Sequence, residues 1–142
     1  MNKRPRGEAF IKRRRSLNES AAMAELTLAA HRVLLRLEIE LMQHGGKNNG
    51  KLIVTYNNFV AFGMHRSTVA PAIRQLVNVG LVEITLRGWR LAANGRPARY
   101  RLTYLDAFGK PPTDEWKAYT PIQKRCQSPA QNSKFRPETV TT

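Results

Sequence analysis

The sequence predicts an α+β domain in which a three-helix core carries a small antiparallel sheet and a long β-hairpin. Apolar residues recur at helical spacing after Thr27 and again over residues 66–79. Residues 81–85 and 99–104 have the composition of strands. A chain of 142 residues with 42% hydrophobic content is long enough for one small domain, and a second domain is not expected.

Changes in composition divide the chain into four parts. We predict a flexible basic arm over residues 1–25, the folded domain over 26–105, an extension over 106–120 that packs on the core, and a disordered polar tail over 121–142. The arm carries a net charge of +4, the domain +8 and the last two parts together +2, which sum to the +14 of the whole chain. A folded domain this basic indicates a polyanionic partner, and nucleic acid is the leading candidate.

The same sequence argues against several other classes of protein. It has neither the run of about 20 apolar residues that a membrane-spanning helix needs nor the amphipathic face of a membrane anchor. No apolar stretch follows the first cations, so we expect no secretory signal and a cytoplasmic location, on the nucleoid when bound to DNA. His31 and His44 lack carboxylate or cysteine partners at ligand spacing, so no metal is expected. Cys126 has no second cysteine with which to form a disulfide.

The N-terminal arm contains four consecutive cations that can follow a phosphate backbone without reading its sequence. They are Lys12, Arg13, Arg14 and Arg15. A solvated, disordered tail explains the run equally well, and the two interpretations are compatible because such arms often order on binding. Directly after the run, Ser16 and Glu19 have the spacing of a capping box, which predicts a short helix there.

The first long helix is predicted from its periodicity and from the residues at its two ends. Thr27 is a suitable N-cap, and the pair Gly45 and Gly46 is a firm stop. Between them leucines alternate with arginine and glutamate at helical spacing. We expect this helix to serve mainly as a scaffold.

A short strand-like run over residues 51–54 leads into a pair of helices. Thr55 can cap a helix over residues 56–62, and Gly63 permits the sharp turn that follows it. The second helix enters at Arg66. A short helix, a glycine turn and a second helix have the spacing of a helix-turn-helix.

The second helix of this pair has one apolar face and one small, polar or cationic face. Val69, Ile73 and Leu76 form the apolar face, and Gly80 ends the helix. The opposite face, which contains no acid, carries Ser67, Ala70, Pro71, Arg74 and Asn78. Such a face suits a helix laid in a DNA major groove. An ordinary amphipathic helix is the alternative, and the neighbouring segments favour the first interpretation.

Pro71 lies several residues into this helix and predicts a kink or a delayed helix start. In either case the first residues stay near the N-terminal end, where unpaired amides and the helix dipole favour phosphate. The residues predicted to face the major groove are Arg66, Ser67, Thr68, Arg74 and Asn78.

Beyond this helix, two strands around a long loop predict a hairpin wing. The loop contains turn residues at Gly88, Gly95 and Pro97, and from Thr85 to Leu105 there are five arginines and no acid. A cationic loop of this kind can straddle a phosphate backbone or insert arginine into a narrow minor groove. The predicted contacts are Arg87, Arg90, Arg96 and Arg99.

Both tryptophans are predicted to pack on the chain's own domain. Trp89 could stack on a sugar or a base, but a tryptophan near a strand end more often packs on its own domain, and we favour that interpretation. In the extension, Trp116 and Tyr119 are expected to lie back on the core.

The order of helix, strand, two helices, strand, wing and strand resembles the bacterial winged helix-turn-helix class. Within that class the chain is similar to a family of small proteins common on alphaproteobacterial chromosomes and mobile elements. The similarity covers residues 26–116 and lies in residues 45–50, 54–56, 70–74 and 100–104. The resemblance implies DNA binding in gene regulation or in the control of a plasmid, prophage or integrative element. It supplies no catalytic residue, and the family usually has an acid where this chain has His65.

The sequence therefore predicts sequence-specific binding of double-stranded DNA by a transcriptional regulator. A replication or recombination accessory factor of a mobile element fits the same features, as does a winged-helix module that binds another protein or RNA. An enzyme is not supported, because there is no phosphate-binding glycine loop, close carboxylate pair or nucleophile with a base partner, and no cofactor is expected. Whether the protein forms a homodimer on paired half-sites stays open.

Overall fold

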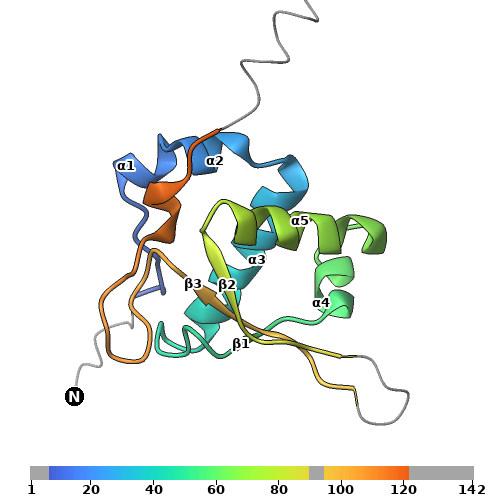
Figure 1. Cartoon of the computed structure of the whole chain (residues 1–142). Helices are drawn as coiled ribbons and strands as arrows, with labels where there is room; N and C mark the ends of the chain where they lie inside the picture. Colours follow the sequence, from blue (N-terminus) through green and yellow to red (C-terminus); the bar gives the residue numbers. More distant parts are fainter. Residues whose placement is uncertain (1–6, 90–94, 122–142) are drawn as a thin grey trace, which may run out of the picture.

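The computed structural model describes residues 7–89 and 95–121 and has the predicted α+β class with a small antiparallel sheet (Figure 1). Its elements in chain order are α1 (Arg15–Asn18), α2 (Ala21–Glu25), α3 (Leu28–Gln43), β1 (Leu52–Ile53), α4 (Tyr56–Ala61), α5 (Arg66–Asn78), β2 (Val82–Leu86), β3 (Arg99–Leu102) and the 3₁₀ helix η1 (Glu115–Ala118). The bounds of the predicted helices and strands differ from these by one or two residues, which is the usual uncertainty of element ends.

The three strands are antiparallel in the order β1-β3-β2, so the last strand along the chain lies at the centre of the sheet. Leu52 lies opposite Tyr100, and Val82 lies opposite Leu102. These four side chains are buried on the same face of the sheet. Because side chains alternate along a strand, the neighbours of these residues along each strand point to the opposite face of the sheet, toward solvent.

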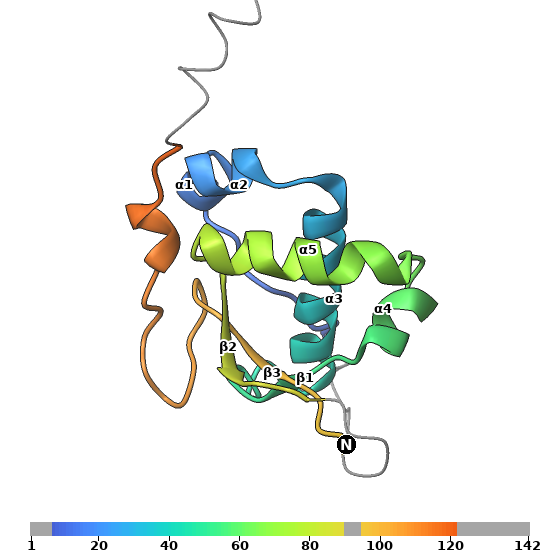
Figure 2. The same ribbon diagram turned by 45° about the vertical axis from the view of Figure 1, so that its right-hand side comes forward.

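The hydrophobic core lies between the buried face of the sheet and the helices α3 and α5, which cross above it (Figure 1, Figure 2). Leu34 and Leu37 of α3, Leu76 of α5, Phe59 of α4 and Leu102 of β3 are fully buried there. Burial of a side chain of this size stabilises the fold by about 1.5 to 3 kcal/mol. The core therefore fixes the position of α4 and α5 relative to the sheet.

The ends of α3 are those predicted from the sequence. The Thr27 side chain accepts a hydrogen bond from the Ala30 amide, which satisfies one of the unpaired amides at the helix start. At the other end, Gly45 and Gly46 have positive φ angles, and the Gly46 amide donates to the Leu41 carbonyl at 3.0 Å. Glycine adopts this conformation without steric cost, so the helix stops here.

The N-terminal segment is part of the folded unit, and the predicted boundary between an arm and a domain at residue 26 is wrong for the described residues. Leu17, Ala22 and Met23 of α1 and α2 belong to the same core as α3 and α5. Apolar side chains in an otherwise basic and polar stretch were too few to reveal this packing from the sequence. Residues 1–6 of the predicted arm lie outside the described part of the chain.

The predicted capping box in this segment is also wrong. Ser16 lies inside α1, whose N-cap residue is Arg14, and no side-chain cap bond is made. Glu19 instead accepts a hydrogen bond from Arg15 at 2.8 Å, one helical turn away. The side-chain cap is made one helix later, where the Ser20 hydroxyl accepts from the Met23 amide at 3.2 Å.

The C-terminal extension packs on the core as predicted. Trp116 is buried, and Tyr119 packs against the same cluster. The backbone of this segment lies so close to Gly80 that a Cβ there would be 2.7 Å from the carbonyl carbon of Glu115. The predicted disordered tail lies, apart from residue 121, outside the described residues.

Candidate nucleic-acid interface

The predicted pair of helices is present as α4 and α5, joined by a tight turn. The Thr55 hydroxyl accepts from the Asn58 amide at 3.1 Å, and the Asn58 side chain accepts from the Thr55 amide at 2.9 Å, which forms a capping box at the start of α4. Gly63 follows α4 with a φ of 98°, a conformation that favours glycine. Met64 is buried beneath the turn and ties it to the core.

The helix α5 has a buried stripe and an exposed stripe on opposite sides. Val69, Ala72, Ile73 and Leu76 are buried. The exposed stripe consists of Ser67, Pro71, Arg74 and Asn78, which fall within about 60° of one another around the helix axis. This group contains three of the five residues that the sequence predicted to face DNA, and it carries a positive charge and no acid.

Of the two outcomes predicted from Pro71, a kink or a delayed helix start, the delayed start is wrong, because α5 runs from Arg66 to Asn78 with Pro71 inside it. The carbonyl that loses its hydrogen bond to a proline at this position belongs to Ser67. Ser67 is exposed, so water can hydrate that carbonyl. Packing of Val69 and Ile73 in the core holds the first turns of the helix in place.

Two residues at the start of α5 are oriented by hydrogen bonds to backbone or neighbouring side chains. The Arg66 guanidinium donates to the Asn57 side-chain carbonyl of α4, so this cation is held at the junction of the two helices. The Thr68 hydroxyl donates to the His65 carbonyl at 2.8 Å. His65 is the N-cap residue but makes no side-chain cap bond.

A further cation lies at this junction that the sequence did not indicate. Arg32 of α3 is exposed, and its Nη1 donates to the Phe62 carbonyl at 3.4 Å. The same nitrogen would be 2.8 Å from a Cβ at Gly63. Arg32 lies 30 positions before Phe62, and no local pattern connects the two.

The strands β2 and β3 continue as a hairpin stem beyond the sheet. The backbones of Trp89 and Arg96 form a bridge with two hydrogen bonds of 2.9 Å. The Arg96 guanidinium lies 3.6 Å from the centroid of the Trp89 ring and donates to the Arg87 carbonyl at 3.3 Å. Trp89 thus packs on its own domain, but on an arginine of its hairpin and not on the core, and 45% of its surface is exposed.

The predicted wing contacts differ in how the structure presents them. Arg87 and Arg99 are exposed, and Arg96 is partly covered by its stacking on Trp89. Arg90 lies in residues 90–94, outside the described part of the chain. Arg101, the fifth arginine of this region, is held by Glu83 at 2.5 Å and by Glu115 at 3.3 Å and serves to fasten the extension to the sheet.

The cations predicted in the arm lie away from α4. In both views α1, which begins at Arg15, is on the side of the molecule opposite α4 (Figure 1, Figure 2). Lys12 and Arg14 line a groove of about 360 Å³ together with Tyr104 and Trp116. These residues do not join α5 and the wing in one surface.

The prediction that Arg13 contacts the phosphate backbone of DNA is wrong, because Arg13 forms an ion pair inside the fold. Its Nε and Nη2 donate to the Glu38 carboxylate at 2.9 and 2.5 Å, and the Tyr104 hydroxyl donates to the same carboxylate at 2.7 Å. Glu38 is only 4% exposed. Its hydrogen bond raises the pKa of the Arg13 guanidinium, and burial raises the pKa of Tyr104 well above its usual value.

Two other kinds of feature are absent from residues 7–89 and 95–121. No three side chains of His, Cys, Asp or Glu come together there in a group that could hold a metal ion. Within the same ranges, none of the helices has the length and apolar character needed to cross a membrane. Within the described residues, exposed cations lie on α5, at the α4–α5 junction and on the β2–β3 hairpin. No family model, curated protein or solved structure matches the chain.

Proposed function

We propose that the chain is a winged helix-turn-helix protein that binds double-stranded DNA sequence-specifically and regulates transcription. In this proposal α4 and α5 form the helix-turn-helix, α5 lies in the major groove, and the hairpin between β2 and β3 is the wing. The exposed, acid-free stripe on α5 is the observation that carries the proposal.

The stripe supports DNA reading through its size and chemistry. An α-helix with its side chains is about 10 to 12 Å wide, and the major groove of B-DNA is about 12 Å wide. Arg74 and Asn78 can form paired hydrogen bonds with guanine and adenine edges, while Ser67 and Pro71 are small enough to allow close approach. These four side chains are exposed along one line of the helix.

Cations on both sides of the stripe supply contacts to phosphate. At the N-terminal end of α5, Arg66 is pre-oriented by Asn57, and Arg32 lies over the turn before it. On the wing, Arg87 and Arg99 are exposed. Contacts of this kind fix the position of a protein on the duplex, and contacts to base edges then give the sequence preference.

The role in transcription rests on the resemblance to small winged helix-turn-helix proteins of chromosomes and mobile elements. A replication or recombination factor would bind DNA through the same surface. Capture of genomic fragments by the full-length protein, followed by sequencing, distinguishes the two roles, because promoters, replication origins and recombination sites have different neighbouring genes. The symmetry of the recovered motif also shows whether paired half-sites are bound.

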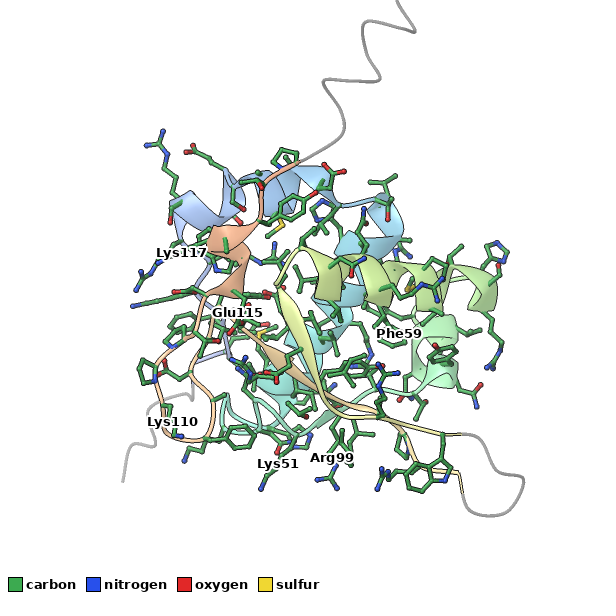
Figure 3. All side chains as sticks on the ribbon, in the orientation of Figure 1. Lys51, Phe59, Arg99, Lys110, Glu115 and Lys117 are labelled. Atoms are coloured by element: carbon green, nitrogen blue, oxygen red, sulfur yellow. The ribbon has the colours of Figure 1, made fainter. Side chains whose placement is uncertain are left out.

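Substitutions on α5 and on the wing test the proposal that α5 reads the bases and that the wing contacts the phosphates. Arg74→Ala should reduce the ratio of specific to random-duplex affinity, since it removes a base contact. Arg87→Ala should weaken binding to both duplexes and lower the salt slope by about one. Lys117→Ala removes an exposed cation of η1, on the side of the molecule away from α4 and the wing (Figure 3); it is the control and should change neither. Equal losses on specific and random duplex from Arg74→Ala would contradict base reading by α5.

A further inference from the structure

A second group of exposed cations and apolar side chains lies on the solvent face of the sheet and on the neighbouring turn between Ala107 and Lys110. We call it the sheet strip, and it consists of Lys110, Phe108, Lys51, Ile53 and Arg99. Figure 3 shows Lys110, Lys51 and Arg99 in a row along the lower margin of the molecule, with side chains directed outward.

The members of the sheet strip are neighbours through the sheet and its turns. The Phe108 ring lies over Gly50, where a Cβ would be 2.4 Å from the ring, and Lys51 follows Gly50 in the chain. Ile53 lies opposite Arg99 on β3. On its other side Arg99 lies opposite Leu86, the last residue of β2 before the wing.

Phe108 occupies a backbone position that a bulky residue rarely adopts. Ala107 and Lys110 form a bridge with hydrogen bonds of 2.9 and 3.1 Å, and the two residues between them have positive φ angles, 54° at Phe108 and 72° at Gly109. A two-residue hairpin turn of this kind favours asparagine or glycine at its first position. The chain places there a phenylalanine of which 59% is exposed. Because Phe108 is exposed, burial in the core does not explain this choice of residue. Backbone strain of this kind is usually tied to function.

The charges around the Phe108 ring are mostly positive. Lys51 follows Gly50, over which the ring lies, and Lys110 closes the turn that carries Phe108. Among the described acids, Asp106 is close in sequence to Phe108, whereas Glu83 and Glu115 are both engaged by Arg101. The sheet strip therefore offers one exposed aromatic ring within a cationic surface.

We propose that the sheet strip binds an unpaired DNA strand. Its cations follow the phosphates, and Phe108 stacks on a base. Exposed aromatic side chains within a cationic surface are the usual means of holding single strands, since every base has a face on which an aromatic ring can stack. Bases in a duplex are already stacked on each other, so an exposed phenylalanine gains little from paired DNA. Because the strip leads into the wing, this inference rests on the proposed duplex binding and extends it to DNA that is locally opened beside the bound site.

Fluorescence anisotropy with a labelled deoxythymidine oligomer of about 15 nucleotides tests the inference on the full chain. Phe108→Asn removes the aromatic face but provides the residue that the turn prefers. We expect its affinity for the oligomer to fall at least about fivefold, with duplex affinity unchanged and the melting temperature equal to or above that of the original chain. Lys51→Ala, which leaves the turn unchanged, should also weaken binding and lower the salt slope.

The matched control is Phe10→Ala, because Phe10 is a second phenylalanine, 78% exposed, that lines the groove on the other side of the molecule. It should bind the oligomer like the original chain. Unchanged oligomer affinity in Phe108→Asn, or an equal loss in Phe10→Ala, would overturn the inference. So would a lower melting temperature in Phe108→Asn with oligomer affinity retained by Lys51→Ala, since Phe108 would then be structural. Tighter binding of a uridine oligomer would overturn the assignment to DNA.

Arg74→Ala separates this inference from the proposed function. It should weaken duplex binding and leave oligomer binding unchanged, because Arg74 lies on the exposed stripe of α5 and not on the sheet. If Arg74→Ala behaves in this way while Phe108→Asn has no effect, duplex binding stands and the sheet strip inference falls. If Arg74→Ala leaves duplex binding intact, the proposed role of α5 falls.

Discussion

Arg13 reaches across to α3 and places its guanidinium in a two-point hydrogen bond with the buried carboxylate of Glu38, at 2.9 and 2.5 Å. The Tyr104 hydroxyl donates a further hydrogen bond to the same carboxylate at 2.7 Å. The ion pair thus ties the segment before α1 to the long helix and to the end of the sheet. Removing one partner of a buried ion pair is costly because the other charge is left in an apolar environment.

Arg13→Ala is expected to lower the free energy of unfolding by about 3 kcal/mol, the lower end of the range for buried pairs, because Arg13 itself is partly exposed. Urea unfolding at neutral pH measures this loss. The matched control is Arg15→Ala, which breaks the exposed pair with Glu19 and should cost about 0.5 kcal/mol or less. Equal effects of the two substitutions would contradict a stabilising role for the buried pair.

His65→Asn is expected to stabilise α5 by about 1 kcal/mol. His65 is the N-cap residue and makes no side-chain cap bond, whereas asparagine there can accept from the amide of Ser67 or Thr68. His65→Asp should stabilise the helix similarly but weaken duplex binding, because it adds a negative charge beside Arg66. Thermal unfolding and DNA affinity of both variants separate the two effects. Equal DNA affinity of the two variants would place the start of α5 away from phosphate.

The buried hydroxyl of Tyr100 is expected to make the folded protein less stable in alkali. Burial, with a smaller effect of nearby Tyr56, raises the pKa of Tyr100 to about 12 from its ordinary value of 10.0. The folded state therefore favours the neutral hydroxyl, and this contribution is complete below pH 10 and is lost as the pH rises through about 12. Between pH 9 and 11 the original chain should lose about 1 kcal/mol more than Tyr100→Phe. Parallel profiles of unfolding free energy for the two proteins would contradict this.

Gly80→Ala is expected to detach the C-terminal extension. Gly80 has a φ of 87°, and an added Cβ would lie 2.7 to 2.9 Å from backbone atoms of Glu115 and Trp116. Gly46→Ala has a similarly positive φ and nothing within 4 Å, so it should cost only about 1 kcal/mol of backbone strain. In a Trp89→Phe background, a red shift of Trp116 fluorescence in Gly80→Ala alone reports exposure of this ring. The same shift in both variants would mean that backbone strain, and not the clash, releases the extension.

The main helices and the β2–β3 hairpin could be predicted because their signals are local, whereas the pairing of β1 with β3 joins distant segments and could not. Thr27 and Thr55 are N-caps in the structure as in the sequence, and Gly63 makes the turn between α4 and α5. A capping side chain acts on amides two or three residues away, so its effect can be read from neighbours in the chain. Ser16 has the capping-box spacing but does not cap a helix, since the N-cap of α1 is Arg14, two residues earlier.

The candidate site could be predicted only in part. The sequence indicated the face of α5, because the periodicity of Val69, Ile73 and Leu76 determines which residues point away from the core. It did not indicate that Asn57 would orient Arg66, or that Arg32 would lie at the turn between α4 and α5. Nor did it indicate that Arg13 would form an ion pair with Glu38. A run of four arginines and lysines has the same appearance whether its members face solvent or a buried acid.

By itself, the sequence determined the order of the main helices and strands, the exposed stripe of α5 and the basic character of the hairpin, because each depends on spacing or composition over a few residues. Tertiary structure alone decided which cations remain exposed and that Phe108 lies over Gly50 next to Lys51. Those relationships join residues up to 58 positions apart in the sequence. They arise because packing of α3 and α5 on the sheet brings distant segments together, and no local pattern records which distant side chains will meet.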